Sequence, residues 1–92
     1  MEFEWDPKKA AENLRKHQVS FNEAATVFGD SLSVSVADPA HFSGEHRYIV
    51  VGASTQGRML LVGYTERGRR TRLISARRLT PSEKRAYEEN QE

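Results

Sequence analysis

The chain has 92 residues, of which 37% are hydrophobic and 29% are charged, enough for one domain with a small core. It has no cysteine, which excludes disulfide scaffolds, thiolate metal sites and cysteine nucleophiles. No apolar stretch reaches the roughly 20 residues that a membrane-spanning helix needs, and the N-terminus is acidic, unlike a secretory signal. We therefore expect one domain, 1–92, that is cytoplasmic and makes no membrane contact.

The net charge of +1 conceals an uneven distribution of charge along the chain. Residues 1–57 carry five Lys/Arg and eight Asp/Glu, residues 58–85 carry nine and two, and residues 86–92 carry none and three. A strongly basic segment thus lies between two acidic ones. Such a segment says more about an anionic partner than the net charge does.

Two short helices are expected at the start of the chain. Asp6-Pro7 is a typical helix start, because the Asp side chain caps free N–H groups and proline suits the first helical position. This helix should end near His17. Ser20 and Glu23 form a capping-box pattern that predicts a second helix.

The middle of the chain has the pattern of strands. Apolar residues alternate with serines over Ser31–Ala37, whereas Arg47–Ser54 and Met59–Thr65 are nearly continuous apolar runs, typical of central strands. A fourth strand is expected over Arg70–Arg77. Phe3–Trp5 is a candidate for a further, short edge strand.

The segment Thr80-Pro81-Ser82-Glu83 predicts a last helix, since it combines a capping box with proline at the first helical position. The expected fold class is therefore α+β: two N-terminal helices, a four-stranded antiparallel meander sheet and one C-terminal helix. The helices would cover one face of the sheet and leave the other face free.

The most informative feature is a run of arginines, with six cations and no acid among the twelve residues 67–78. A solvated strand face is one explanation, but surfaces usually mix both signs, and like charges on neighbouring strands repel. Because arginine binds phosphate bidentately, we predict a phosphate-bearing or acidic partner. Alternation along the strand places Arg70, Arg72 and Arg78 on one face and Arg77 on the other.

His17, beside Lys16 at the end of the first helix, is a candidate general acid or base. A histidine there is also a common cap that complements the helix dipole, and for His17 alone that simpler interpretation is favoured. His41 and His46 show no metal-ligand spacing with Asp or Glu, so no metal site is expected.

Two further features allow more than one interpretation. Tyr64 lies next to the arginine-rich hairpin, which makes base stacking or proton transfer a candidate role. Glu45 and Arg47 form an E-x-R pair on one strand face, for which a weak surface ion pair is the favoured interpretation. The residues by themselves thus indicate a small α+β domain that binds a polyanion, with a nuclease as one option.

Segments along almost the whole chain resemble the BrnT family of bacterial type II toxins, in the same order and spacing. The most specific are the W-D-x-x-K, K-H-x-V-S-F and R-x-I-S-A-R type segments. The full set comprises Phe3–Ala10, Asn13–His17, Val19–Ala24, Glu45-x-Arg47, Gly52, Tyr64-Thr65, Arg72–Arg77 and Glu83-x-x-x-Tyr87. One departure is Gln18, where the family usually has a glycine, which adopts a left-handed conformation at little cost.

This resemblance implies a RelE-like fold and RNA cleavage without a metal or other cofactor, which would inhibit translation. It also implies neutralisation by an antitoxin with a ribbon-helix-helix DNA-binding domain, in a heterotetramer that contacts operator DNA only through the antitoxin. In such an enzyme a ribose 2′-hydroxyl attacks the adjacent phosphate, and an acid protonates the departing 5′-oxygen.

The resemblance also suggests roles for individual residues, which we treat as hypotheses. Arg72 and Arg77 match the R-x-I-S-A-R segment and are assigned to stabilise charge on the phosphate, and His17 is assigned to proton transfer, with Lys16 or Lys8 as substitutes. The residues expected to bind RNA are Lys8, Lys16, Arg47, Arg58, Tyr64, Arg70 and Arg78.

Two alternatives involve no catalysis. A basic module would bind nucleic acid or an acidic protein without cleaving RNA, and a regulatory subunit would use its arginines only to dock a partner. RNA cleavage distinguishes these alternatives from the toxin, whereas complex formation does not.

Overall fold

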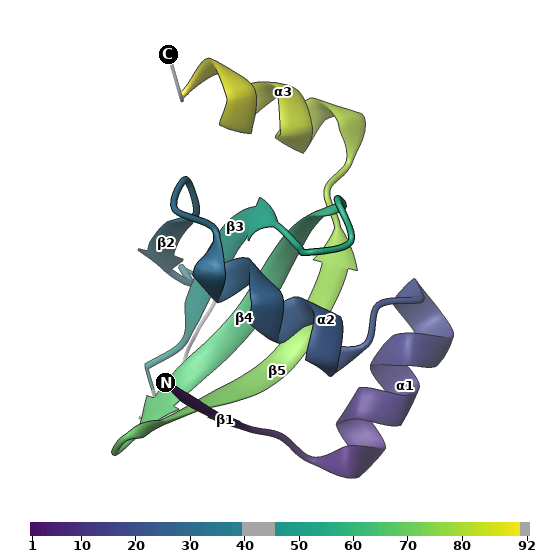
Figure 1. Ribbon diagram of the computed structural model, residues 1–92, viewed down its shortest axis with the longest axis vertical. Coiled ribbons are helices and arrows are strands. Elements are labelled where there is room, and N and C mark those ends of the chain that lie inside the picture. Colours follow the sequence, from purple (N-terminus) through teal and green to yellow (C-terminus); the bar gives the residue numbers. More distant parts are fainter. Residues whose placement is uncertain (40–45, 91–92) are drawn as a thin grey trace.

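The protein is built on one sheet, with the two N-terminal helices on one side of it and the C-terminal helix at one end (Figure 1). The computed structural model describes residues 1–39 and 46–90; His41 and Glu45, considered above, lie outside the described residues. In chain order the elements are β1 (Glu2–Glu4), α1 (Pro7–His17), α2 (Phe21–Thr26), the 3-10 turn η1 (Val27–Gly29), β2 (Val34–Ala37), β3 (Tyr48–Ala53), β4 (Met59–Arg67), β5 (Arg70–Arg78) and α3 (Pro81–Glu89).

The sheet has five described strands, in the order β1-β5-β4-β3-β2, and not the four that we expected. Strands β2 to β5 form the predicted antiparallel meander, whereas β1 pairs parallel with β5. The sequence marked this strand only as a candidate, because three residues are too few to show alternation. Phe3 holds β1 to the core through its ring, 5.1 Å from the ring of Phe28. The α+β class is confirmed.

Helices α1 and α2 begin at the predicted caps. The Asp6 side chain accepts from the Lys8 N–H at 2.8 Å, and the Ser20 hydroxyl accepts from the Glu23 N–H at 3.0 Å. Helix α1 ends at His17 and is capped by Gln18, which has φ 57° and is the only non-glycine residue with positive φ in the described chain. The left-handed conformation expected at the family's glycine position is therefore present, at a cost of about 1–2 kcal/mol for a residue with a side chain.

The core lies between the sheet and the two N-terminal helices (Figure 1). Side chains from α2, η1 and the central strands meet there and are almost fully buried, and the largest apolar ones are Phe21, Leu60, Leu73, Val19, Val27, Val50 and Val62. Burying each of them contributes about 1.5–3 kcal/mol. This small core defines an inner face of the sheet, toward α1 and α2, and an outer face opposite.

A β-bulge interrupts the pairing of β4 with β5. Gly63 pairs with Ser75 but Tyr64 pairs with Leu73, so β5 has one extra residue, Ile74. On β5, the alternation of side chains between the two faces of the sheet therefore shifts by one residue after Ile74.

Beyond the bulge, Arg77 pairs with Leu61 on the outer face, and Arg78 pairs with the buried Leu60 on the inner face. The predicted distribution of arginines is thus wrong past Ile74: Arg77, and not Arg78, shares the outer face with Arg70 and Arg72.

The outer face is not entirely free, because α3 borders it at one end (Figure 1). The helix starts with the predicted capping box, in which Thr80 and Glu83 each accept from the other's N–H. The Tyr87 hydroxyl then donates to the Leu32 carbonyl at 2.7 Å. Strand β2 is shorter than the predicted Ser31–Ala37, and its valines face outward instead of packing in the core.

Candidate functional site

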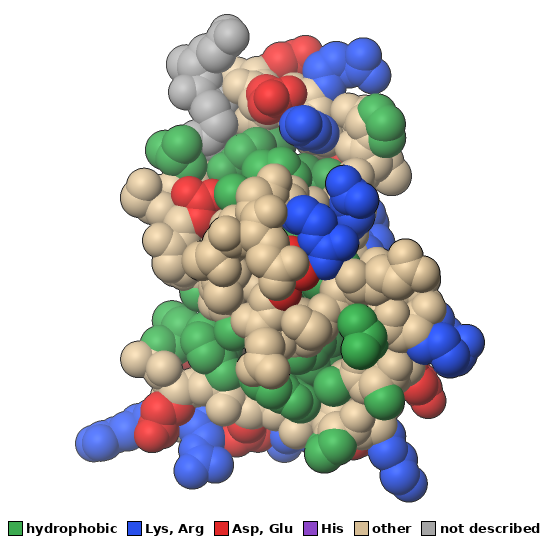
Figure 2. All heavy atoms as spheres, turned by 45° about the vertical axis from the view of Figure 1, so that its right-hand side comes forward, with side chains coloured by type: hydrophobic (Ala, Val, Ile, Leu, Met, Phe, Trp, Pro, Cys, Tyr) green, Lys and Arg blue, Asp and Glu red, His purple; other side chains and the backbone are tan. Residues whose placement is uncertain are grey.

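The arginines of residues 67–78 have carboxylate neighbours in the folded protein that the sequence does not show. Arg72 Nη1 lies 2.8 Å from Glu4 Oε2, and Arg70 lies 3.6 Å from Glu4 and 3.8 Å from Glu2. These acids come from β1, beside the start of β5. Figure 2 shows acidic side chains among the basic ones at the lower end of the molecule. Part of the repulsion that we attributed to a missing partner is therefore relieved within the chain.

Arg77 is paired in the same way, with a carboxylate of α3. Its Nη1 and Nη2 each lie 2.8 Å from one oxygen of Glu83, the bidentate geometry that a phosphate would also adopt. The Arg77 guanidinium, together with the Thr80 N–H, lowers the pKa of Glu83 to about 2. The Arg77 side chain is still 38% exposed, so it remains accessible from solvent.

Arg58, predicted to bind RNA, forms the buried ion pair of the fold. Its guanidinium donates to both oxygens of Glu23, whose side chain is only 2% exposed, and also to the Gln18 carbonyl at 3.0 Å. The Ser54 hydroxyl donates to the same carboxylate at 2.7 Å. The hydrogen bonds from Arg58 lower the pKa of Glu23. Glu23 therefore does not complete the predicted capping box with Ser20, because its carboxylate turns to Arg58 instead.

Tyr64 is a core residue. Its side chain is 8% exposed, and its ring lies 5.0 Å from the ring of Phe28 and 5.5 Å from that of Tyr48. A base has no access to either face of a ring packed in this way, so its burial does not support the stacking role. Tyr64 faces inward because it is in phase with the buried Leu60 and Val62 on β4; its nearness to the arginine-rich hairpin in the sequence did not reveal which face it occupies.

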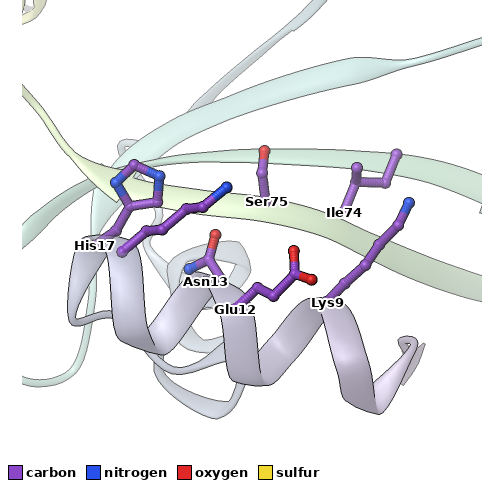
Figure 3. Close-up of a pocket in the computed structure, with 7 residues that line it drawn as sticks. Lys9, Glu12, Asn13, His17, Ile74 and Ser75 are labelled. Carbon is purple, nitrogen blue, oxygen red and sulfur yellow. The ribbon is translucent and has the colours of Figure 1, made fainter.

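A shallow depression of about 250 Å³ lies between α1 and β5 (Figure 3). Its helix side carries residues spaced by three or four, which fall on one face of α1. Its strand side consists of two neighbouring residues that the bulge exposes. The lining residues are Lys9, Glu12, Asn13, Lys16, His17, Ile74 and Ser75. Figure 3 shows the His17 ring and the Ser75 hydroxyl on the same side of the helix.

Asn13 holds the two sides of this depression together. Its amide nitrogen donates to the Ala76 carbonyl at 2.8 Å and to the Val19 carbonyl at 2.9 Å, while its oxygen accepts from the Ala76 N–H at 3.0 Å. Strand β1 pairs with β5 only as far as Arg72. Further along, the Asn13 side chain takes the place of a neighbouring strand and satisfies the buried backbone groups of Ala76.

Gly63 gives Ser75 its position at the bulge. A β-carbon at Gly63 would lie 2.8 Å from the Ser75 hydroxyl oxygen, closer than van der Waals contact allows. The absence of a side chain on β4 therefore lets the Ser75 side chain lie across the sheet at the edge of the depression.

The predicted site residues fall into separate groups. His17 and Lys16 line the depression, and Arg77 lies two residues beyond Ser75 on β5. Arg70 and Arg72 lie at the other end of β5, near the hairpin, and Arg47 precedes β3 at that end as well.

Two predicted cations lie elsewhere, and five lining residues were missed. Lys8 does not line the depression, and Arg78 is on the inner face. The missed residues are Lys9, Glu12, Asn13, Ile74 and Ser75. The spacing of Lys9 from Lys16, seven residues, was the signal that could have identified the helix face.

Among residues 1–39 and 46–90, no three His, Cys, Asp or Glu side chains gather in a way that could hold a metal ion. None of the helices in that part of the chain is long and apolar enough to cross a membrane.

The fold and the site define a small α+β domain with a cationic depression beside the edge of its sheet. The chain belongs to the BrnT family, described as "Ribonuclease toxin, BrnT, of type II toxin-antitoxin system", which matches residues 5–83. The resemblance inferred from the sequence is thereby confirmed.

The fold is also similar to that of a solved relative. The crystal structure of the Brucella abortus ribonuclease toxin BrnT aligns with a TM-score of 0.64 and 19% identity, over 87% of this chain and 97% of that one. A search of curated proteins gave no match.

Proposed function

We propose that the protein is a metal-independent endoribonuclease toxin that inhibits translation by cleaving RNA in the cytoplasm. One observation carries the proposal: two of the three most specific family segments, far apart in the sequence, meet at one surface. Lys16 and His17 of the K-H segment line the depression with Ile74 and Ser75 of the R-x-I-S-A-R segment. Asn13 connects these segments through its hydrogen bonds to Val19 of the first and Ala76 of the second.

The proposed chemistry uses the groups around this depression. His17 either accepts the proton of the ribose 2′-hydroxyl or donates a proton to the leaving 5′-oxygen. Lys16 or Lys9 performs the other proton transfer, and both lysines supply positive charge. Arg77 stabilises the charge that develops on the scissile phosphate, which is commonly the largest catalytic contribution.

A second group of arginines holds the neighbouring RNA backbone. Arg72 and Arg77 are five residues apart on β5, about 16 Å at the usual rise of a strand, so they contact different phosphates. Arg70 and Arg47 extend the RNA-binding surface beyond Arg72 at the hairpin end of the sheet.

Carboxylates compete with RNA for these arginines. Glu83 uses two of the guanidinium N–H groups of Arg77, and Glu4 binds Arg72. Arginine has five donors, so a phosphate either binds the remaining ones or displaces the carboxylate. RNA binding should therefore weaken steeply with salt.

The family implies an antitoxin partner, and we propose that it carries a ribbon-helix-helix DNA-binding domain. It would cover the cationic surface around β5 in a heterotetramer with the toxin. Contact with operator DNA would then occur only through the antitoxin.

The experiment is cleavage of single-stranded RNA by the purified, antitoxin-free protein in the presence of EDTA. His17→Ala and Arg77→Ala should each lower the rate at least 100-fold. Matched controls are His46→Ala and Arg85→Ala, which remove exposed groups of the same kind away from the depression. Wild-type rates in both site variants would refute the assignment, and loss of activity with EDTA would refute metal independence.

The alternative, a non-enzymatic basic module that binds nucleic acid or an acidic protein, has one observation in its favour. Arg72 and Arg77 both hold carboxylates in this structure, as they would hold an acidic protein. This alternative predicts salt-dependent RNA binding with no cleavage at any salt concentration.

A further inference from the structure

Strand β2 is an edge strand, and no other described strand pairs with it on the side away from β3. It is the last strand in the order β1-β5-β4-β3-β2, and all four of its residues are exposed. Proteins normally protect such edges with charged residues, proline or a bulge. Residues 31–37 read Ser-Leu-Ser-Val-Ser-Val-Ala and contain neither a charge nor a proline.

The hydrogen-bond phase of the β2–β3 pair shows which backbone groups face outward. The Asp38 N–H donates to the Arg47 carbonyl at 2.9 Å, directly across the two strands. Hydrogen-bonded and non-hydrogen-bonded pairs alternate in an antiparallel ladder. The N–H and carbonyl groups of Ser35 and Ala37 therefore point away from β3, toward a side where no other described strand pairs.

An apolar groove continues from this edge across the outer face. Val34 and Val36 are 44% and 52% exposed. They line a groove of about 280 Å³ whose other walls are the outer-face residues Val51 and Leu61 and, on α3, Tyr87. An added strand at the β2 edge would thus bring its side chains against an apolar surface.

We propose that this edge pairs with β2 of a second copy of the chain, antiparallel about a two-fold axis. In the register that places Ser35 opposite Ala37 of the partner subunit, the outward groups of both residues form four hydrogen bonds across the axis. Val36 then meets Val36 of the partner subunit in a non-hydrogen-bonded pair, the closer type of cross-strand contact.

Two features favour a second copy over another strand. The edge is complementary to itself in hydrogen bonding and in side chains, as a two-fold interface requires. It is also uncharged, so two copies bring no like charges together. Four hydrogen bonds and two valines per subunit make a small contact, and small interfaces are weak, so we expect monomer and dimer to exchange with concentration.

The dimer would leave the candidate active site accessible. The α1–β5 depression lies at the opposite side of the sheet order from β2, so each subunit presents its own depression. This inference therefore does not depend on the proposed ribonuclease function, and RNA cleavage by a monomeric variant should equal that of the wild type.

The test is sedimentation velocity of the full chain over a 100-fold range of concentration. The wild type should shift from monomer to dimer, whereas Val36→Lys, which places two ammonium groups at the axis, should remain monomeric. Leu14→Lys is the matched control: Leu14 is 51% exposed on α1, and this variant should dimerise like the wild type. Circular dichroism checks that both variants are folded.

Hydrogen exchange gives a second, independent readout. At high concentration the amides of Ser35 and Ala37 should be protected in the wild type and exchange faster in Val36→Lys. A wild type that stays monomeric throughout overturns the proposal, as does equal dimerisation of the wild type and Val36→Lys. Protection of these amides only when an antitoxin is bound would also overturn it, because the edge would then belong to a different partner.

Discussion

Replacing Arg58 by methionine should destabilise the protein strongly, because it leaves the Glu23 carboxylate buried without its cation. Glu23 is 2% exposed and accepts hydrogen bonds from Arg58 and from Ser54. In Arg58→Met only the Ser54 hydroxyl remains. This substitution keeps a long apolar stem, so the loss reports on the charge and its hydrogen bonds more than on packing.

The magnitude follows from how far the pair is removed from water. Breaking a fully buried ion pair costs about 3–5 kcal/mol, but Arg58 is 26% exposed, so we expect a loss of about 3 kcal/mol. For a domain of this size that corresponds to a decrease in Tm of about 15 °C. The double variant with Glu23→Met should lose less than Arg58→Met alone, because no unpaired charge remains buried.

The assay is urea unfolding followed by circular dichroism, with Arg69→Met in the exposed hairpin as the matched control. Folding lowers the pKa of Glu23 below the unfolded-state value of 4.5. The ionised Glu23 side chain therefore stabilises the fold above pH 4.5, and this stabilisation is lost as the pH falls further. The difference between wild type and Arg58→Met should shrink over the same range. If Arg58→Met lost under 1 kcal/mol but bound RNA much more weakly, Arg58 would be an RNA ligand after all.

Three further predictions concern single side chains. Asn13→Ala should lower the free energy of unfolding by about 3 kcal/mol in urea unfolding, since it leaves the N–H and carbonyl of Ala76 buried without partners; an effect under 1 kcal/mol would contradict this. Glu83→Gln keeps the helix cap but releases Arg77, so RNA should bind more tightly in a filter-binding assay, with less than 1 kcal/mol of stability lost because the pair is partly exposed. The stability from Glu83 should disappear as the pH falls from 4.5 toward its pKa of about 2, and an acid-unfolding curve unchanged by Glu83→Gln would be inconsistent with this. Gln18→Gly should raise Tm by relieving about 1 kcal/mol of left-handed strain, and an unchanged Tm would mean that the turn is not strained.

The sequence predicted the elements whose signals are local. Asp6 and Pro7 mark the start of α1, and Thr80 with Glu83 marks the start of α3, because a capping residue acts within one turn of its own helix. The continuous apolar runs likewise identified β3 and β4 as central strands. Such signals need only neighbouring residues to be interpreted.

What the sequence did not predict depends on contacts between distant residues. The partners of Arg58 and Arg72 lie 35 and 68 residues away in the chain, so no pattern of spacing reveals them. A bulge adds one residue without changing composition, and period-2 alternation therefore misassigned Arg77 and Arg78. Of the residues that line the depression, only Lys16 and His17 were among the predicted site residues, and they were chosen for their chemistry and the family segment; helix periodicity could have added Lys9 and Glu12, but not the strand opposite them.

The extra residue at Ile74 has its consequence in the local shape of the strand. If Ile74 were removed, Ala76 and Arg77 could stay opposite the same residues of β4, so Ala76 would still face the interior and Arg77 the outer face. The depression would lose one of the two strand residues that line it, together with the bend that a bulge gives its strand. The bulge therefore matters for the shape of the site, whereas the faces of Ala76 and Arg77 are set by their pairing with β4.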